Sequence, residues 1–235
     1  NYALGLALIM LFGMLNFTPM VLLPTLMRGQ MGFPDSLVGQ VVGARGLGGL
    51  AGFFAVMFLE RIDPRVSVAT GFGLLAIAGI WLMRIDLNVS ALELSLNGIV
   101  QGLAAGIIVV ALTLTTFTGM SREKMAEATA VYHLIRNIGA SLFISICVAE
   151  VVRSTGFNYA RLTELVSPYN RAFAGPAVDT MFDVTSAVGL ERLSREISKQ
   201  SAMIAYINAF GLFTAAAAIA MPLIMFLRRP EARPA

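Results

Sequence analysis

The sequence predicts an all-α, polytopic membrane protein with six transmembrane helices. Hydrophobic residues make up 57% of its 235 residues and charged residues 13%, whereas charged residues make up about 25% of a typical soluble domain. The apolar residues gather in six runs, each long enough to cross a bilayer core of about 30 Å as a helix. The runs lack strict alternation of apolar and polar residues and are too long for barrel strands, which excludes a β-barrel.

The six runs and the segments between them define the expected organisation of the chain. The expected helices cover residues 3–27, 37–59, 67–83, 92–117, 126–152 and 201–227. Short connections, beginning with a turn that contains Gly29, Gly32 and Pro34, join the first five helices, so residues 1–152 form one block. Residues 153–200 form a long polar segment, and residues 228–235 a tail. Over residues 189–200, apolar and charged residues alternate at helical spacing, which predicts an amphipathic helix on the membrane surface.

The basic residues predict the orientation in the membrane. The connections at residues 60–65 and 119–125 and the tail carry more Lys and Arg than the other two short connections. The positive-inside rule therefore places them, and the C-terminus, in the cytoplasm. Long segments cross with less regard for charge, so residues 153–200 are expected outside. The same rule accounts for the net charge of +3 better than nucleic-acid binding does.

Several classes of chemistry are excluded by residue counts. One histidine and one cysteine cannot form a multi-histidine metal site, a thiolate cluster or a disulfide framework. Paired carboxylates and a phosphate-binding loop are also missing from the apolar runs, so we expect no enzyme activity, metal or cofactor. The chain starts at Asn1 and enters an apolar run without the basic region of a signal peptide. We therefore expect it to begin part-way through a larger protein.

Polar side chains inside the apolar runs are the candidate functional residues, because each one costs free energy in the bilayer. His133, Arg136 and Asn137 share one helix face at spacings of three and four residues. His133 is also a candidate to change charge near neutral pH. The other candidates are Asn16, Arg45, Asn97, Gln101 and Asn208. The alternative is that these groups only form hydrogen bonds between packed helices.

Glycines recur every four residues in two of the expected helices. Gly98, Gly102 and Gly106 form one such series, and the second helix contains the pairs Gly39 with Gly43 and Gly48 with Gly52. Small residues at this spacing let helix backbones approach closely. Close packing is the favoured interpretation, although helices that rock against each other would show the same pattern.

Short motifs in a recurring order resemble a known family. They are Ala44-Arg45-Gly46-Leu47-Gly48, Arg61-Ile62-Asp63-Pro64-Arg65, Gln101-Gly102-Leu103-Ala104-Ala105-Gly106, Arg136-Asn137-Ile138-Gly139-Ala140-Ser141, Ala160-Arg161-Leu162-Thr163-Glu164 and Gln200-Ser201-Ala202. Together they resemble the C-terminal half of a drug:proton antiporter of the major facilitator superfamily, the fourteen-helix EmrB/QacA type. Two positions depart from the family pattern: Ala44 replaces a proline, and Asn208 stands where relatives often have an aspartate.

The resemblance implies a six-helix half-bundle that rocks against a missing N-terminal half in alternating access. An amphipathic small molecule would leave the cell as a proton enters. Asn16, Arg45, Gln101, His133, Arg136, Asn137 and Asn208 would line the substrate and proton pathway, and Arg61, Asp63 and Arg65 would form a cytoplasmic gate. The expected location is the bacterial cytoplasmic (inner) membrane. The expected partners are the lipid bilayer and, at the long outer segment, a periplasmic adaptor protein. The alternatives are an uptake symporter of the same superfamily and a non-transporting truncated fragment or scaffold.

Overall fold

The computed structural model describes residues 2–59, 63–166, 182 and 186–226. The helices in these residues are α1 (Tyr2–Gly29), α2 (Asp35–Leu59), α3 (Pro64–Leu82), α4 (Ala91–Phe117), α5 (Arg122–Glu164) and α7 (Ala187–Met225). Each of the six is long and apolar enough to cross a membrane, which confirms the prediction of an all-α protein with six spans. Arg61, the tail and most of the segment between α5 and α7 lie outside the described residues.

Local sequence signals explain where several helices begin. Asp63 caps α3 by accepting a hydrogen bond from the backbone N–H of Arg65, and proline occupies the first position of that helix. Ser90 caps α4 and Ser186 caps α7 in the same way, each through its side-chain oxygen. These caps satisfy backbone donors that a helix leaves unpaired at its start. The short connections can therefore end one membrane helix and begin the next without long loops.

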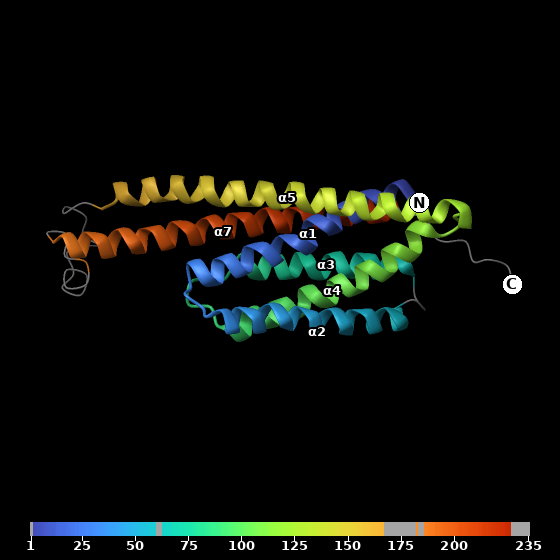
Figure 1. Ribbon diagram of the computed structural model, residues 1–235, viewed down its shortest axis with the longest axis horizontal. Helices are drawn as coiled ribbons and strands as arrows, with labels where there is room; N and C mark the ends of the chain where they lie inside the picture. Colours follow the sequence, from blue (N-terminus) through green and yellow to red (C-terminus); the bar gives the residue numbers. More distant parts are fainter. Residues whose placement is uncertain (1, 60–62, 167–181, 183–185, 227–235) are drawn as a thin grey trace.

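Helices α5 and α7 are longer than a membrane span requires. Helix α5 continues past residue 152 to Glu164, and residues 189–200 form the first part of α7, continuous with the last span. Figure 1 shows these two helices side by side, extending together beyond the ends of the other four. We call residues 153–164 and 187–200 the α5–α7 extension.

The α5–α7 extension differs from the separate surface helix that the sequence predicted. Leu193 is 8% exposed, whereas Leu190 is 48% exposed, so protein covers only part of the apolar side of residues 189–200. The hydroxyls of Tyr159 on α5 and Ser194 on α7 lie 2.9 Å apart and join the two helices. Residues 189–200 therefore continue the last span and are joined to α5.

The helices pack in two related sets. In one set, α2 and α3 both pack on α4. In the other set, α5 and α7 both pack on α1. Helices α3 and α7 also pack on each other. Because the spans alternate in direction, α1 and α4 run in opposite directions. Figure 1 shows α1 between α5 and α2. In this packing, α1 corresponds to α4, α2 to α5, and α3 to α7.

Glycines make the closest of these contacts. A Cβ added at Gly48 or Gly52 of α2 would meet the backbone oxygen of Ile99 or Leu103 of α4. A Cβ added at Gly102 or Gly106 of α4 would meet the backbone of α2 in turn. The packing interpretation is therefore confirmed for these glycines. Gly39 and Gly43 have no atom within 4 Å of an added Cβ, so they do not contribute to this contact.

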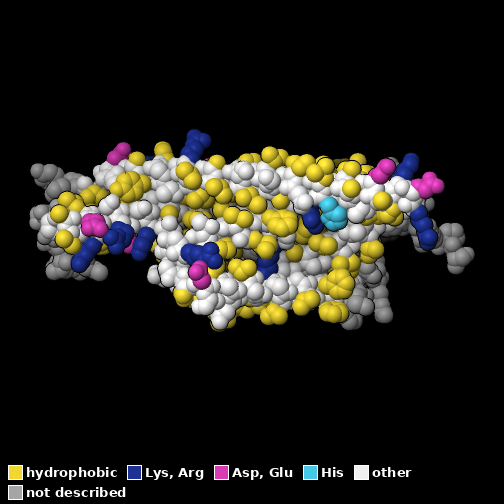
Figure 2. Space-filling view, viewed as in Figure 1, with side chains coloured by type: hydrophobic (Ala, Val, Ile, Leu, Met, Phe, Trp, Pro, Cys, Tyr) yellow, Lys and Arg dark blue, Asp and Glu magenta, His cyan; other side chains and the backbone are white. Residues whose placement is uncertain are grey.

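Charged and apolar side chains are separated along the length of the molecule. Figure 2 shows Lys, Arg, Asp and Glu gathered toward the two ends, with mostly hydrophobic side chains between them. Large hydrophobic residues such as Phe53, Phe54 and Leu142 are more than half exposed. Such a surface suits contact with lipid or with another membrane-embedded partner. The few polar groups at this depth are therefore the place to look for function.

Candidate functional site

Arg45 lies within α2 and joins three helices through hydrogen bonds. Its Nη1 donates to Oε1 of Gln101 on α4 over 2.6 Å. Its Nη2 donates to both the backbone oxygen and Oδ1 of Asn16 on α1, over 2.8 Å each. These partners are neutral, so the positive charge of Arg45 is held by dipoles and not by a carboxylate.

The hydrogen bonds continue from Gln101 into the buried interior. Nε2 of Gln101 donates to Oδ1 of Asn97 over 2.6 Å, and Nδ2 of Asn97 donates to the backbone oxygen of Ala78 on α3 over 2.9 Å. Gln101 is 0% exposed and Asn97 1% exposed. Each amide accepts with its oxygen and donates with its nitrogen, so both side chains are satisfied. We call Asn16, Arg45, Gln101 and Asn97 the Arg45 network.

Asn16 lies in a turn of α1 that contains a proline. Pro19 lies inside α1 and has no backbone N–H, so the carbonyl of Leu15 loses its usual partner within the helix. Asn16 is the next residue in this weakened turn. In a membrane, backbone groups freed by proline need polar partners from neighbouring helices. Arg45 contacts the same turn one residue further on, where its Nη2 donates to the backbone oxygen and the side-chain oxygen of Asn16.

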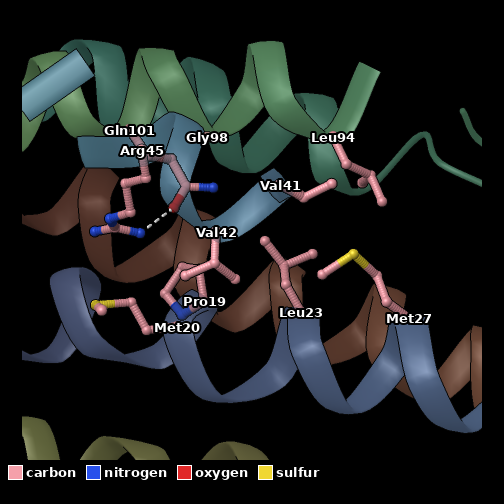
Figure 3. A pocket seen from close by; sticks show the side chains of 10 residues that line it. All are labelled: Pro19, Met20, Leu23, Met27, Val41, Val42, Arg45, Leu94, Gly98 and Gln101. Carbon is pink, nitrogen blue, oxygen red and sulfur yellow. Dashed lines mark hydrogen bonds between the residues drawn. The ribbon is translucent and has the colours of Figure 1, made fainter. Parts of the chain in front are cut away.

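A small cavity with about 20 Å³ of accessible space lies beside the Arg45 network, between α1, α2 and α4. Figure 3 shows Arg45 and Gln101 joined at one end, while Leu23, Val41 and Leu94 lie toward the other. The cavity is therefore apolar with a polar end, and its accessible space is about that of a single water molecule, far less than a small-molecule ligand needs.

Arg136 lies within α5 and has much weaker contacts than Arg45. Its Nε donates to Oδ1 of the neighbouring Asn137 over 3.4 Å. Its guanidinium carbon lies 5.9 Å from the centre of the Phe17 ring on α1, a distance at which a cation and an aromatic face attract. No ion pair joins it to a carboxylate among the described residues. Most of its N–H donors therefore remain available.

Two open grooves lie on either side of Arg136 along α5. One, of about 410 Å³, lies between α1 and α5 and is lined by Phe17, Asn137, Ser141 and Ser145 among others. The other, of about 450 Å³, lies between α4 and α5 and contains His133. The shared face predicted for His133, Arg136 and Asn137 therefore divides between two grooves, with the arginine between them.

His133 lies in an aromatic and hydroxyl-rich part of its groove. Its ring meets that of Tyr132 edge-on, with centres 5.6 Å apart, and Tyr132 lies 5.2 Å from Phe117. The hydroxyl of Tyr132 is 3.4 Å from that of Thr113 on α4. His133 itself is exposed. Its imidazole is therefore open to the groove and not covered by protein.

Asn208 and the predicted gate lie apart from these residues. Nδ2 of Asn208 on α7 donates to Oγ of Ser154 on α5 over 3.0 Å, so Asn208 is not joined to the Arg45 network. In the gate, Asp63 serves as the cap of α3. The Nε of Arg65 and the Oγ of Ser67 are buried and have no hydrogen-bond partner within the described part of the chain.

Two residues near the site, Phe17 and Tyr132, were outside the predicted set, and Asn97 was predicted only as a single polar residue without a partner. Asn97 lies four residues before Gln101 in the same apolar run, and this spacing could have indicated that the two side chains interact. Phe17 and Tyr132 gave no such signal, because aromatic residues are also common on surfaces that face lipid.

Comparison with known proteins identifies membrane transporters as relatives. The chain is homologous to the multidrug export protein EmrB of Escherichia coli K12, with 24% identity over 98% of this chain and 46% of that protein. It is also 24% identical to EmrB of Haemophilus influenzae over 72% of this chain, and 23% identical to the probable multidrug resistance protein EmrY of E. coli K12 over 98% of this chain. No family model matches the chain.

The relatives are transporters and not enzymes, and the chain is a multi-pass membrane protein related to them. The chain spans about half the length of EmrB and EmrY of E. coli K12.

Proposed function

We propose that this chain, a membrane homologue of the EmrB-type multidrug exporters, is the C-terminal half of a proton-driven efflux transporter that works by alternating access. The observation that carries the proposal is the homology to EmrB over 98% of the chain. In this mechanism two halves rock around a site near the middle of the membrane. The other half comes from sequence outside these 235 residues.

The geometry of α1, α4 and α5 supports a substrate pathway on this side of the bundle. Arg136, Asn137 and His133 contribute polar groups next to open grooves, while Phe17 and Phe117 contribute apolar surface. A multidrug site needs this combination, because apolar area binds many ligands and a few polar groups orient them. We assign Asn16, Arg45 and Gln101 to the same pathway, and Asn208 to its outer part.

We propose that α2 and α3 are joined in the cytoplasm of a bacterial cell, where Arg61, Asp63 and Arg65 act as a gate. The gate residues would form contacts in one conformation and release them in the other. The same orientation places the α5–α7 extension on the outer side of the inner membrane. Its position beyond the other helices makes it the place where a periplasmic adaptor protein would bind.

The test of this function compares the chain with and without the sequence that its gene encodes upstream. Everted membrane vesicles from cells lacking their own efflux pumps would receive an imposed pH gradient and an amphipathic fluorescent dye. We expect gradient-dependent dye accumulation inside the vesicles only when both parts are present. Accumulation by the 235 residues alone would contradict the half-transporter assignment. Dye movement in the opposite direction would indicate a symporter, and no movement with both parts in the membrane would indicate a scaffold.

A further inference from the structure

The two sets of three helices correspond residue by residue at their closest contacts. A Cβ added at Gly102 of α4 would meet the backbone oxygen of Arg45 on α2, and a Cβ added at Gly13 of α1 would meet the backbone oxygen of Arg136 on α5. The contact between α4 and α2 is therefore equivalent to the contact between α1 and α5. Arg45 and Arg136 occupy equivalent places in the two sets.

A second pair of contacts fixes the same alignment. An added Cβ at Gly48 would meet the backbone oxygen of Ile99, and one at Gly139 would meet that of Met10. Each of these glycines follows its arginine by three residues. The spacing from Met10 to Ile99 also equals the spacing from Gly13 to Gly102. The correspondence therefore holds over at least one turn of each helix.

The equivalent arginines have different surroundings. Arg45 donates to Gln101 and Asn16. In this alignment, Gln101 of α4 corresponds to Phe12 of α1. Asn16 of α1 corresponds to Ala105 of α4. Neither Phe12 nor Ala105 has a side chain that can accept a hydrogen bond. The neighbouring helices therefore supply side-chain acceptors to Arg45, whereas the equivalent positions beside Arg136 carry none.

We propose that Arg45 is a positioning residue, and that Arg136 is the member of the pair that meets the substrate. This assignment rests on the proposed transport function. Arg45 holds α1 at Asn16, and the next residue on α1 is Phe17, whose ring lies below Arg136. The Arg45 network thereby sets the distance between Arg136 and Phe17. A guanidinium only donates, so Arg136 recognises an acceptor oxygen of a substrate whose apolar part lies along Phe17.

The first experiment compares Arg45→Gln with the matched variant Arg136→Gln, using the chain together with its upstream sequence. The first readout is the midpoint of thermal unfolding of the purified protein. The side chain of Arg45→Gln is shorter and has a single amide nitrogen, so it cannot donate to Gln101 and Asn16 at the same time, and we expect a fall of about 5 °C. Arg136→Gln should change the midpoint by less than about 2 °C. Arg45→Lys, which keeps the length and charge of the side chain, should recover part of the loss.

The second readout is the dependence of transport rate on substrate concentration. Arg45→Gln should lower kcat with KM little changed, because the network acts on the arrangement of α1. Arg136→Gln should raise KM about tenfold, the loss expected for one hydrogen bond from a charged donor. Equal falls in the unfolding midpoint, or a raised KM in Arg45→Gln alone, would overturn the assignment. If the wild-type protein is folded but moves no substrate, the proposed function fails. The difference in unfolding midpoint between Arg45→Gln and Arg136→Gln then still tests whether Arg45 is a positioning residue.

A gain-of-contact variant provides an independent test. Ala105→Asn places an acceptor where the alignment predicts that Arg136 could reach it, and Ala105→Val is the control of similar size. We expect Ala105→Asn to raise the unfolding midpoint above that of Ala105→Val and to lower kcat, because Arg136 becomes held in place. Adding Arg136→Gln should cancel the gain. A midpoint equal to that of Ala105→Val, or a gain that survives Arg136→Gln, would contradict the equivalence of the two arginines.

Discussion

The guanidinium of Arg45 and the amide of Gln101 meet across 2.6 Å between α2 and α4, which pairs a charge inside the membrane with a neutral side chain. A carboxylate in the place of Gln101 would cancel the charge. The amide keeps it and passes the hydrogen bond on to Asn97. Fully satisfied polar networks hold a packed interior in one arrangement. This relationship is the basis of the first prediction.

Replacing Gln101 by Leu should destabilise the protein. The change removes the acceptor for Nη1 of Arg45 and the donor for Oδ1 of Asn97, and it leaves both in a buried place. We expect a loss of about 1–3 kcal/mol per unpaired group, measured by thermal or denaturant unfolding in detergent. Gln200→Leu is the control, because Gln200 is exposed and its amide donates to Glu196 at the surface. Equal losses in the two variants would show that the Arg45 network does not stabilise the fold.

The helices could be predicted from the sequence because a long apolar run has few alternatives in a membrane. The prediction for the first helix, residues 3–27, differs little from α1 (Tyr2–Gly29). The lengths of α5 and α7 could not be predicted in this way. Beyond the membrane their stability depends on contacts such as Tyr159 with Ser194, which join residues far apart in the sequence.

The candidate site could be predicted only as a set of polar residues. Helical spacing places His133, Arg136 and Asn137 on one face, but it does not say which helix lies opposite. The difference between Arg45 and Arg136 depends on the neighbouring helices α1 and α4 and is invisible in the spacing of either motif. Their roles in transport therefore stay predictions, while their hydrogen bonds are properties of the fold.

Replacing Gly102 by Ala should push α4 away from α2. The added Cβ would meet the backbone oxygen of Arg45 and the backbone nitrogen of Gly49, and backbone atoms cannot move aside as side chains do. We expect a loss of about 1–3 kcal/mol in unfolding free energy. Gly156→Ala is the control, since no atom lies within 4 Å of its added Cβ, and it should be neutral or stabilising by up to about 1 kcal/mol. A neutral Gly102→Ala would mean that the two helices are not in contact in solution.

Two substitutions at Asp63 should separate its role as a helix cap from its role in the gate. Asp63→Asn keeps a side-chain oxygen for the N–H of Arg65, so stability should change little. Asp63→Ala removes the cap and should cost about 1 kcal/mol. If the negative charge acts in the gate, Asp63→Asn should slow turnover while equilibrium substrate binding stays nearly unchanged. Weaker binding together with normal turnover would contradict the gate.

The pH dependence of transport tests His133. Its imidazole is exposed in a groove and lies about one helical turn from Arg136 on α5. If a change in the charge of His133 modulates transport, His133→Gln should alter the shape of the pH profile of substrate efflux. The control is Thr129→Ser, which changes the same groove without changing its charge. An unchanged profile in His133→Gln would remove the histidine from the proton pathway.

The last prediction concerns which side of α5 meets water. Ser141 lines the groove between α1 and α5, whereas Leu142 is the next residue and is 53% exposed. The two side chains point about 100° apart around the helix, at nearly the same depth. Arg136, one turn before Ser141, needs a wet cavity or a partner, because an unpaired charge is costly in lipid. We therefore expect the groove side of α5 to be hydrated and the Leu142 side to face lipid.

Cysteine labelling can measure this difference. The native Cys147 is buried and would first be replaced by Ala, after which Ser141→Cys and Leu142→Cys would be made separately. A membrane-impermeant thiol reagent, applied to membranes containing the chain and its upstream sequence, should modify Ser141→Cys at least about tenfold faster, because the reactive thiolate forms only where water can reach it. An amphipathic substrate should slow the reaction at position 141 and leave position 142 unchanged. Equal rates, or faster labelling of Leu142→Cys, would place lipid against the groove and remove Arg136 from the transport pathway.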